Sequence, residues 1–291
     1  MKSNKTQEQS MMHFFLFDPN IYPAMLVTLR GELTAEQIET AVKKAYTRNE
    51  TTMSKVVLEK GEAYFQVLPE TGCKVTIDSR DWREIMHQSE KDTFKINEGE
   101  LMRCYILPQE NEFKLFVMAH HIVGDGTALV FFVQDVLNCL DGRDTEYRAL
   151  NLEGSLGLPP KAKFPMKSKI GLKLLNKQWK KTGKPFTWED YYHIHREFWK
   201  NRKNHVEIKE IEKEELAAIK EKCKALGITI NSYILADVLR ENPSRKLIGC
   251  PVSIRGTNRS INNQVMTLKF PHEYVTELSF EENAKKVHQT I

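Results

Sequence analysis

The nine residues Met118–Gly126, MAHHIVGDG, mark the place where an apolar strand turns into a helix. Before them, EFKLFVMA (residues 112–119) alternates as a strand does. After them, apolar side chains recur at spacings of one, three and four as far as Leu140, as on a helix packed against a sheet. The junction itself carries two histidines, a carboxylate and two glycines. Because an imidazole at a strand end can accept a proton near neutral pH, the sequence predicts a general base on a rigid scaffold.

The residues of this motif are expected to have different roles. His120 and His121 point to opposite faces if the strand continues, so one of them is expected to be structural. Asp125 can turn back to hold neighbouring side chains or backbone amides, and Gly124 and Gly126 are interpreted as permitting a tight turn. Metal ligation by the histidines and Asp125 is the alternative. No cluster with convincing ligand spacing accompanies them, so no metal is expected.

Composition excludes several classes of protein. The 291 residues suffice for two lobes, and the net charge of +4 is too small to indicate nucleic-acid binding. No apolar run approaches the roughly 20 residues that span a bilayer, and the polar start MKSNKTQEQS lacks the apolar centre of a signal peptide. The five cysteines lie far apart and form no CxxC pair. These features predict a cytoplasmic protein with a disordered start at residues 1–10.

The remaining pattern is an α/β or α+β mixture in two parts. A capping box, Thr34 with Gln37, opens an early helix. Further helices are expected at 83–94, in the aromatic stretch 187–199, on both sides of Gly227 and at 279–291. Strands are predicted at 54–60, 63–69, 73–78, 101–108, 112–119, 205–211, 247–255 and 264–270. The motif GxSxG, the P-loop and GxGxxG are absent from the sequence, which leaves serine hydrolases, P-loop enzymes and Rossmann enzymes without support.

A basic interval follows the central helix. Between Glu153 and Glu189 there is no acidic residue but there are nine lysines, interleaved with apolar residues. We interpret this interval as a solvated linker and helix face. A surface for a phosphate-bearing ligand, an acidic partner protein or a membrane is the alternative.

The motif resembles a known family. HHIVGDG matches the HHxxxDG motif of the condensation-domain superfamily of acyltransferases, which includes alcohol acetyltransferases and, more distantly, chloramphenicol acetyltransferase. The strand pair before the motif and the helix after it also resemble those of the family. So do the helices at 214–241 and the stretches PVSIRGTNR and NNQVMTLKF. The resemblance covers most of residues 11–291 in order.

The resemblance implies a two-lobed chloramphenicol acetyltransferase-like fold, in which each lobe is a mixed sheet covered by helices. We expect an N-terminal lobe at 11–149, a linker with the basic helix at 150–186 and a partial C-terminal lobe at 187–291. His121 would be the proton acceptor, with His120 secondary, Asp125 architectural and Gly126 letting the loop approach the substrate. Substrate binding is assigned to Arg255 and Asn263.

The resemblance also implies the reaction. An alcohol or amine acceptor would attack an acyl thioester carried on coenzyme A or on the phosphopantetheine arm of a carrier protein, without a bound cofactor or covalent intermediate. Because a thioester is already activated, the enzyme mainly aligns two substrates and removes one proton.

Two departures from the family pattern favour a second hypothesis. Met53 stands where many condensation domains have an arginine that pairs with the motif aspartate, and the chain ends without a DFGWG-like segment, so the second lobe is expected to be incomplete. The alternative is therefore a non-catalytic condensation-like module, or a fragment, that docks a carrier or partner protein.

Overall fold

Two compact units make up the described part of the protein. The computed structural model describes residues 16, 18–19, 22–59, 62–68, 73–151, 166–206, 208, 210–257 and 259–291. The first unit falls within residues 1–204 and 254–264, and the second comprises 205–253 and 265–291. This division differs from the expected lobes, because the aromatic helix and the segment 254–264 both group with the first unit. The expected disordered start at 1–10 and residues 152–165 of the expected linker lie outside the described residues.

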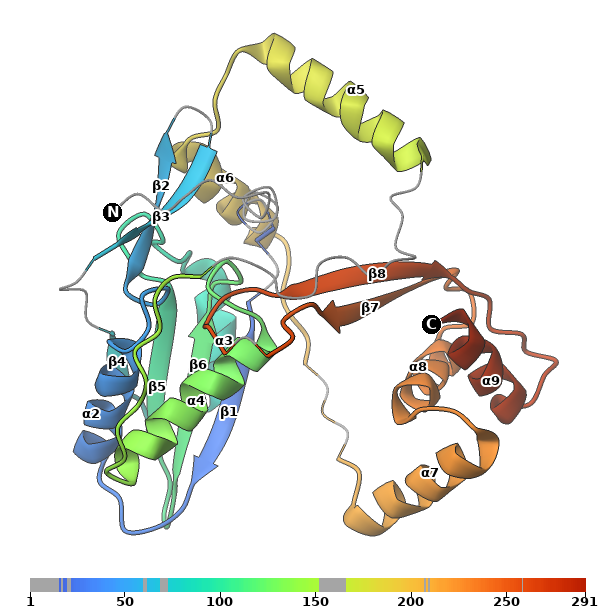
Figure 1. Ribbon diagram of the computed structural model, residues 1–291, viewed down its shortest axis with the longest axis horizontal. Coiled ribbons are helices and arrows are strands. Elements are labelled where there is room, and N and C mark those ends of the chain that lie inside the picture. The colour runs from blue at the N-terminus through green and yellow to red at the C-terminus, as the bar shows by residue number, and fades with distance from the viewer. Residues whose placement is uncertain are drawn as a thin grey trace. The chain divides into compact units, whose positions relative to one another are not determined.

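A four-stranded mixed sheet in the order β1-β6-β5-β4 forms the centre of the first unit (Figure 1). Its strands are β1 (Ala24–Leu29), β4 (Val75–Ile77), β5 (Met102–Pro108) and β6 (Phe113–Ala119). β6 pairs antiparallel with β1 and β5, whereas β4 joins β5 in parallel. The predicted pair of strands on either side of the polar turn 109–112 is confirmed as β5 and β6. A separate antiparallel hairpin consists of β2 (Ser54–Glu59) and β3 (Glu62–Val67).

The helices of this unit are α2 (Ala35–Tyr46), α3 (Trp82–Lys91), α4 (Gly126–Leu140), α5 (Met166–Thr182) and α6 (Trp188–Trp199). α2, α3 and α4 contact the sheet, and α6 contacts α3. All residues from Leu115 to Ala119 in β6 are buried, so both alternating sets of its side chains are covered. α2 and α4 lie side by side against the sheet (Figure 1), and Trp82 of α3 contacts Phe116 of β6. The capping box of Thr34 and Gln37 is confirmed at the start of α2.

The second unit is smaller. It contains α7 (Lys213–Leu226), α8 (Ile230–Glu241), β7 (Leu247–Ser253), β8 (Val265–Pro271) and α9 (Phe280–Thr290). Gly227 ends α7 in the left-handed conformation with φ of 66°, as its position between two helices predicts. β7 and β8 form an antiparallel pair, which is not the mixed sheet expected for this lobe. The strand predicted at 205–211 is also wrong, because none of the described residues there is in a strand.

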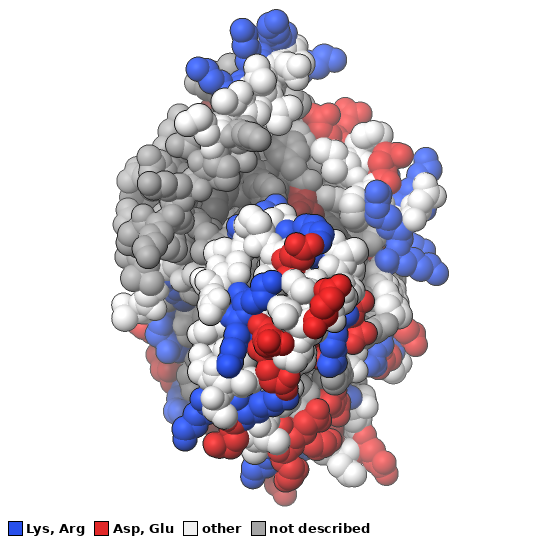
Figure 2. Space-filling view, turned by 90° about the vertical axis from the view of Figure 1, so that its right-hand side faces the viewer, with Lys and Arg blue, Asp and Glu red and all other residues white. Residues whose placement is uncertain are grey.

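Charge is distributed unevenly. Figure 2 shows Lys and Arg interspersed with Asp and Glu over much of the face turned to the reader. α5 differs, because its sequence contains lysines and no acidic residue, and its apolar Met166, Ile170 and Leu174 are all more than half exposed. Across the described residues, no helix combines the length and apolarity that crossing a membrane requires.

Candidate active site

The two histidines lie where the chain leaves β6. The backbone N–H of His120 donates to the carbonyl of Leu101 at 3.0 Å, so the sheet pairing reaches this residue. The N–H of Val123 then donates to the carbonyl of His120 at 2.9 Å and closes a turn. The two imidazoles diverge, as the strand geometry predicts: His120 is 1% exposed, whereas His121 is partly exposed.

His120 is held as a neutral packing residue. Its Nδ1 accepts a hydrogen bond from the backbone N–H of Ile122 at 3.3 Å, and the rings of Tyr22, Phe94 and Tyr191 surround it. Burial lowers the pKa of His120 to about 3, with smaller contributions from the neighbouring His195 and His121. An enclosed imidazole of this kind supports the turn rather than reaching a substrate.

The histidine pair of α6 also divides into one buried and one exposed ring. His195 is buried, and its Nδ1 lies 3.0 Å from the hydroxyl of Tyr22. Burial lowers the pKa of His195 to about 4, whereas His193 is exposed. His195 therefore helps to attach α6 to the rest of the first unit through side-chain packing.

His121 has the environment of a proton acceptor. Burial lowers its pKa, while a hydrogen bond from the ring to its own backbone carbonyl and the carboxylates of Asp125 and Asp18 oppose this effect. The ring is therefore neutral near pH 7, as a general base must be. The side-chain amide of Asn263 lies 3.1 Å from Nδ1 of His121. The structure thus brings together His121 and one of the two residues assigned to substrate binding.

Asp125 fixes the start of α4. It is the N-cap, and its Oδ1 accepts from the N–H of Ala128 at 2.9 Å. A carboxylate at this position also interacts favourably with the positive end of the helix dipole. Its Oδ2 accepts from the N–H of Gln264 at 2.9 Å. Asp125 therefore joins the motif turn to a segment far along the chain.

Arg255 supplies the cation for Asp125. Its Nη2 lies 3.1 Å from Oδ1 and 3.0 Å from Oδ2 of Asp125, and the arginine is only 3% exposed. The guanidinium also donates to the backbone carbonyls of Asn262 and Ser260. Arg255 thus provides the positive charge for the motif aspartate that Met53 cannot provide, and its assignment to substrate binding stays a prediction. Met53 itself is buried in the core.

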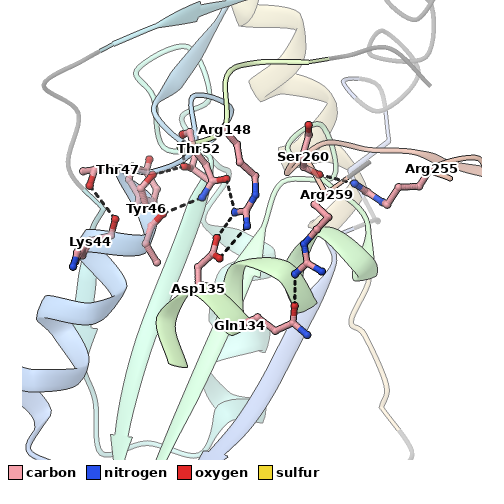
Figure 3. Close-up of polar contacts among 12 residues, drawn as sticks. Lys44, Tyr46, Thr47, Thr52, Gln134, Asp135, Arg148, Arg255, Arg259 and Ser260 are labelled. Carbon is pink, nitrogen blue, oxygen red and sulfur yellow. Dashed lines mark hydrogen bonds and ion pairs between the residues drawn. The ribbon is translucent and has the colours of Figure 1, made fainter. Parts of the chain in front are cut away.

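The segment 254–264 is attached to the first unit at several points. Figure 3 shows Arg255 donating to Ser260 and Arg259 extending to Gln134 of α4, where Nη2 and Oε1 are 2.8 Å apart. The guanidinium of Arg259 also lies 4.5 Å from the ring centre of Phe131. These contacts hold the segment against α4.

A second, partly buried ion pair supports α4 at another position along the helix. Figure 3 shows the guanidinium of Arg148 on both carboxylate oxygens of Asp135 in α4. Arg148 also donates to the side chain of Asn49, just after α2. α4 is therefore fixed by ion pairs near its start and in its second half.

The two glycines of the motif do not need left-handed backbone. Neither Gly124 nor Gly126 has a positive φ. A Cβ at Gly124 would lie 2.6 Å from the Cβ of Ala128, so this position requires glycine for close packing. Gly126 is the first residue of α4, and a Cβ there would meet nothing within 4 Å. The prediction that both glycines are needed for a tight turn is therefore wrong, because Gly124 is needed for close packing and Gly126 has room for a side chain.

Sequence reasoning missed two residues of the site. Asn262 is buried and its side chain contacts Arg255 and the carbonyl of Asn151, while Gln264 contributes its backbone N–H to Asp125. The doublet of asparagines at 262–263, just before an apolar strand, was the available signal, because amides that become buried need polar partners. Among the described residues, no group of three or more His, Cys, Asp or Glu side chains could hold a metal ion.

Known proteins resemble this chain in sequence and in fold. A family model described as "Condensation domain" matches residues 6–153, just over half of the chain. The hybrid PKS-NRPS synthetase xenE of Xenoacremonium sinensis is 26% identical over 123 residues, which are 40% of this chain and 3% of that protein. The chain thus spans only a small part of this relative.

Solved structures give the fold. The first condensation domain of the CDA synthetase has a TM-score of 0.62 at 14% identity, covering 99% of this chain and 75% of that one. The SgcC5 protein from Streptomyces globisporus has a TM-score of 0.59 at 15% identity, covering 98% of this chain and 72% of that one. The mixed α/β fold with helix-covered sheets, and the resemblance stated from the motif, are confirmed. The chain belongs to the condensation-domain family.

Proposed function

We propose that this protein is an acyltransferase that moves an acyl group from a coenzyme A or carrier-protein thioester to an alcohol or amine, with His121 as general base. One observation supports the proposal: the imidazole of His121 is partly exposed and has a lowered pKa, and it lies in a turn that the buried Asp125–Arg255 pair holds in place. Such an arrangement suits a reaction that needs alignment and one proton transfer.

The chemistry assigns one role to each group. His121 accepts the proton of the acceptor O–H or N–H as the oxygen or nitrogen attacks the thioester carbonyl. The C–S bond then breaks, and the proton is passed to the leaving thiolate to give a free thiol. Asp125 and Arg255 do not touch the reacting atoms in this scheme, because both are buried and hold the turn in place.

Product formation tests the proposal directly. Acetyl-, hexanoyl- and palmitoyl-CoA, and S-hexanoyl-N-acetylcysteamine as a mimic of a carrier-bound donor, would each be incubated with butanol or butylamine. The acylated acceptor is measured by mass spectrometry, which avoids interference from the five cysteines of the chain. General-base catalysis contributes about 10²–10⁴-fold, so His121→Ala should lose at least about 100-fold in rate.

His193→Ala is the matched control, since His193 is an exposed histidine of the same unit. It should keep the wild-type rate. Undiminished transfer in His121→Ala would contradict the assignment of the base.

A non-catalytic docking module is the second candidate. The buried Asp125–Arg255 pair is equally consistent with it, because this pair would hold the turn whether or not His121 transfers a proton. Absence of acylated product with every donor and acceptor, together with binding of a phosphopantetheinylated carrier protein, would support this candidate over the enzyme.

A further inference from the structure

Helix α5 has an unusual composition. Its 17 residues include lysines but neither an acidic residue nor an arginine. The nearest acidic residues along the chain are Glu153 and Glu189, so no carboxylate within the helix can pair with a lysine one turn away. α5 therefore carries a concentrated positive charge that nothing within the helix neutralises.

The lysines of α5 are confined to one side of the helix. At about 3.6 residues per turn, all their positions fall within half of the circumference, which we call the lysine half. They are Lys167, Lys169, Lys173, Lys177, Lys180 and Lys181. The opposite, uncharged half contains Leu172, Leu175 and Trp179, which recur at spacings of three and four. The sequence of α5 is thus amphipathic.

Apolar side chains of α5 are exposed together with its charges. Leu175 of the uncharged half is 61% exposed. The described lysines 173, 177 and 181 are exposed, and so are the apolar residues of the lysine half, Met166, Ile170 and Leu174. Exposed apolar side chains next to a dense positive charge fit a binding surface that is both anionic and apolar.

A bilayer of anionic lipids has both properties. Its surface potential attracts lysines, whose flexible stems reach the headgroups while neighbouring apolar side chains enter the acyl boundary. A nucleic acid would match the charge but offers no apolar layer for Leu172 and Leu175. Arginine, which suits bidentate contacts with phosphate or carboxylate groups, is absent from residues 149–195. The combination of lysine with apolar residues therefore favours the lipid surface.

We propose that α5 binds the surface of a bilayer that contains anionic lipids, with its uncharged half against the acyl boundary and its lysines at the headgroups. The helix lies on the bilayer and does not cross it, because its many lysines would be costly in the bilayer centre. This proposal does not rest on the proposed function, because His121 takes no part in the binding.

Flotation of the full chain with vesicles tests the proposal. Vesicles of phosphatidylcholine alone are compared with vesicles of phosphatidylcholine and phosphatidylglycerol. The protein should float with the anionic vesicles at low salt, remain in solution with the neutral ones, and be released by high salt, which screens the charges. Absence of binding to the anionic vesicles, or equal binding to both kinds, would overturn the proposal.

Removing charge from the lysine half gives the first variant. Lys173→Gln, Lys177→Gln and Lys181→Gln are combined, because these lysines are exposed and glutamine keeps a good helix propensity. A lysine near an anionic bilayer contributes about fivefold to partitioning, so the triple variant should bind about 100-fold more weakly.

The matched control changes three exposed lysines of α7 to glutamine, at positions 213, 220 and 224. It should bind as the wild-type chain does. Equal losses in the two triple variants would overturn the assignment of the binding to α5.

The uncharged half is tested by Leu175→Gln. Because a leucine would be withdrawn from the acyl boundary, binding to the anionic vesicles should fall by about tenfold. Ile234→Gln on α8, where the isoleucine is 46% exposed, should leave binding unchanged. Binding that is lost in the lysine variant but unchanged in Leu175→Gln would show attraction to any polyanion, and would overturn the proposal of a helix seated in a lipid surface.

Discussion

Replacing Asp125 by asparagine should destabilise the first unit far more than an ordinary surface substitution. The variant keeps an oxygen that can cap α4 but removes the charge that Arg255 faces. The side chains of Arg255 and Asp125 are only 3% and 7% exposed, so a buried cation would be left without its counter-charge. Removing one partner of a buried ion pair costs about 3–5 kcal/mol. Because the cap survives, we expect a loss of about 3 kcal/mol in the free energy of unfolding.

A double-mutant cycle isolates the pair itself. Arg255→Met should cost a similar amount, since it leaves the carboxylate buried without its cation. The double variant leaves no buried charge at this position, so its loss should fall short of the sum of the single losses by about 2 kcal/mol or more.

Urea unfolding followed by tryptophan fluorescence measures these losses in the relevant unit. All four tryptophans, at positions 82, 179, 188 and 199, lie in the sequence range of the first unit. Asp141→Asn is the matched control, because Asp141 pairs with Arg143 while both are more than 60% exposed, and it should cost less than about 1 kcal/mol. Additive losses in the cycle, or a loss in Asp125→Asn as small as in the control, would refute the assignment of a coupled buried pair.

Two further substitutions test the packing around the turn. The pKa of His195 in the folded protein is about 4, below the ~6.5 of an exposed imidazole. The unfolded chain therefore binds a proton at this histidine at higher pH than the folded protein does, so the free energy of unfolding declines as the pH falls from about 6.5 to 4. In urea titrations at several pH values, His195→Gln should reduce the slope of stability against pH by up to about 1.4 kcal/mol per pH unit, whereas the control His193→Gln should not. An equal slope in both variants would contradict burial as the cause. Gly124→Ala should cost about 1–3 kcal/mol because its Cβ would clash with Ala128, whereas Gly126→Ala should be neutral or slightly stabilising, and thermal melts that rank the two variants in the opposite order would count against this packing.

Local patterns predicted the elements of the first unit because each element there is encoded within its own stretch. The alternation before His120 and the helical spacing after Asp125 both correspond to what the structure shows. The alternation at 205–211 predicted a strand wrongly, because a strand also depends on residues outside its own stretch. A strand forms only when another strand pairs with it, and the apolar Val206 and Ile208 in this stretch are exposed.

The candidate site could be predicted only in part. His121 and Asp125 lie within one short motif, so their chemistry is visible in the sequence. The role of Arg255 is not visible in the sequence, because its ion pair joins residues 130 positions apart. The pair also requires residues 254–264 to belong to the first unit, which the local pattern does not indicate. The same holds for Asn263, since nothing in its local pattern indicates that it faces an imidazole.

Residues 254–264 belong to the first unit although they lie in the sequence between two stretches of the second. This affects the order in which the first unit can fold during synthesis. Chains leave the ribosome at about 5–20 residues per second, and the N–H of Gln264 follows Asp125 by 139 positions. The motif therefore emerges on the order of ten seconds before its cation and its last hydrogen-bond donor are available. During that interval the first unit can collapse around its sheet, but the carboxylate must stay in water, so the loop that carries His121 is expected to be the last part of this unit to become ordered.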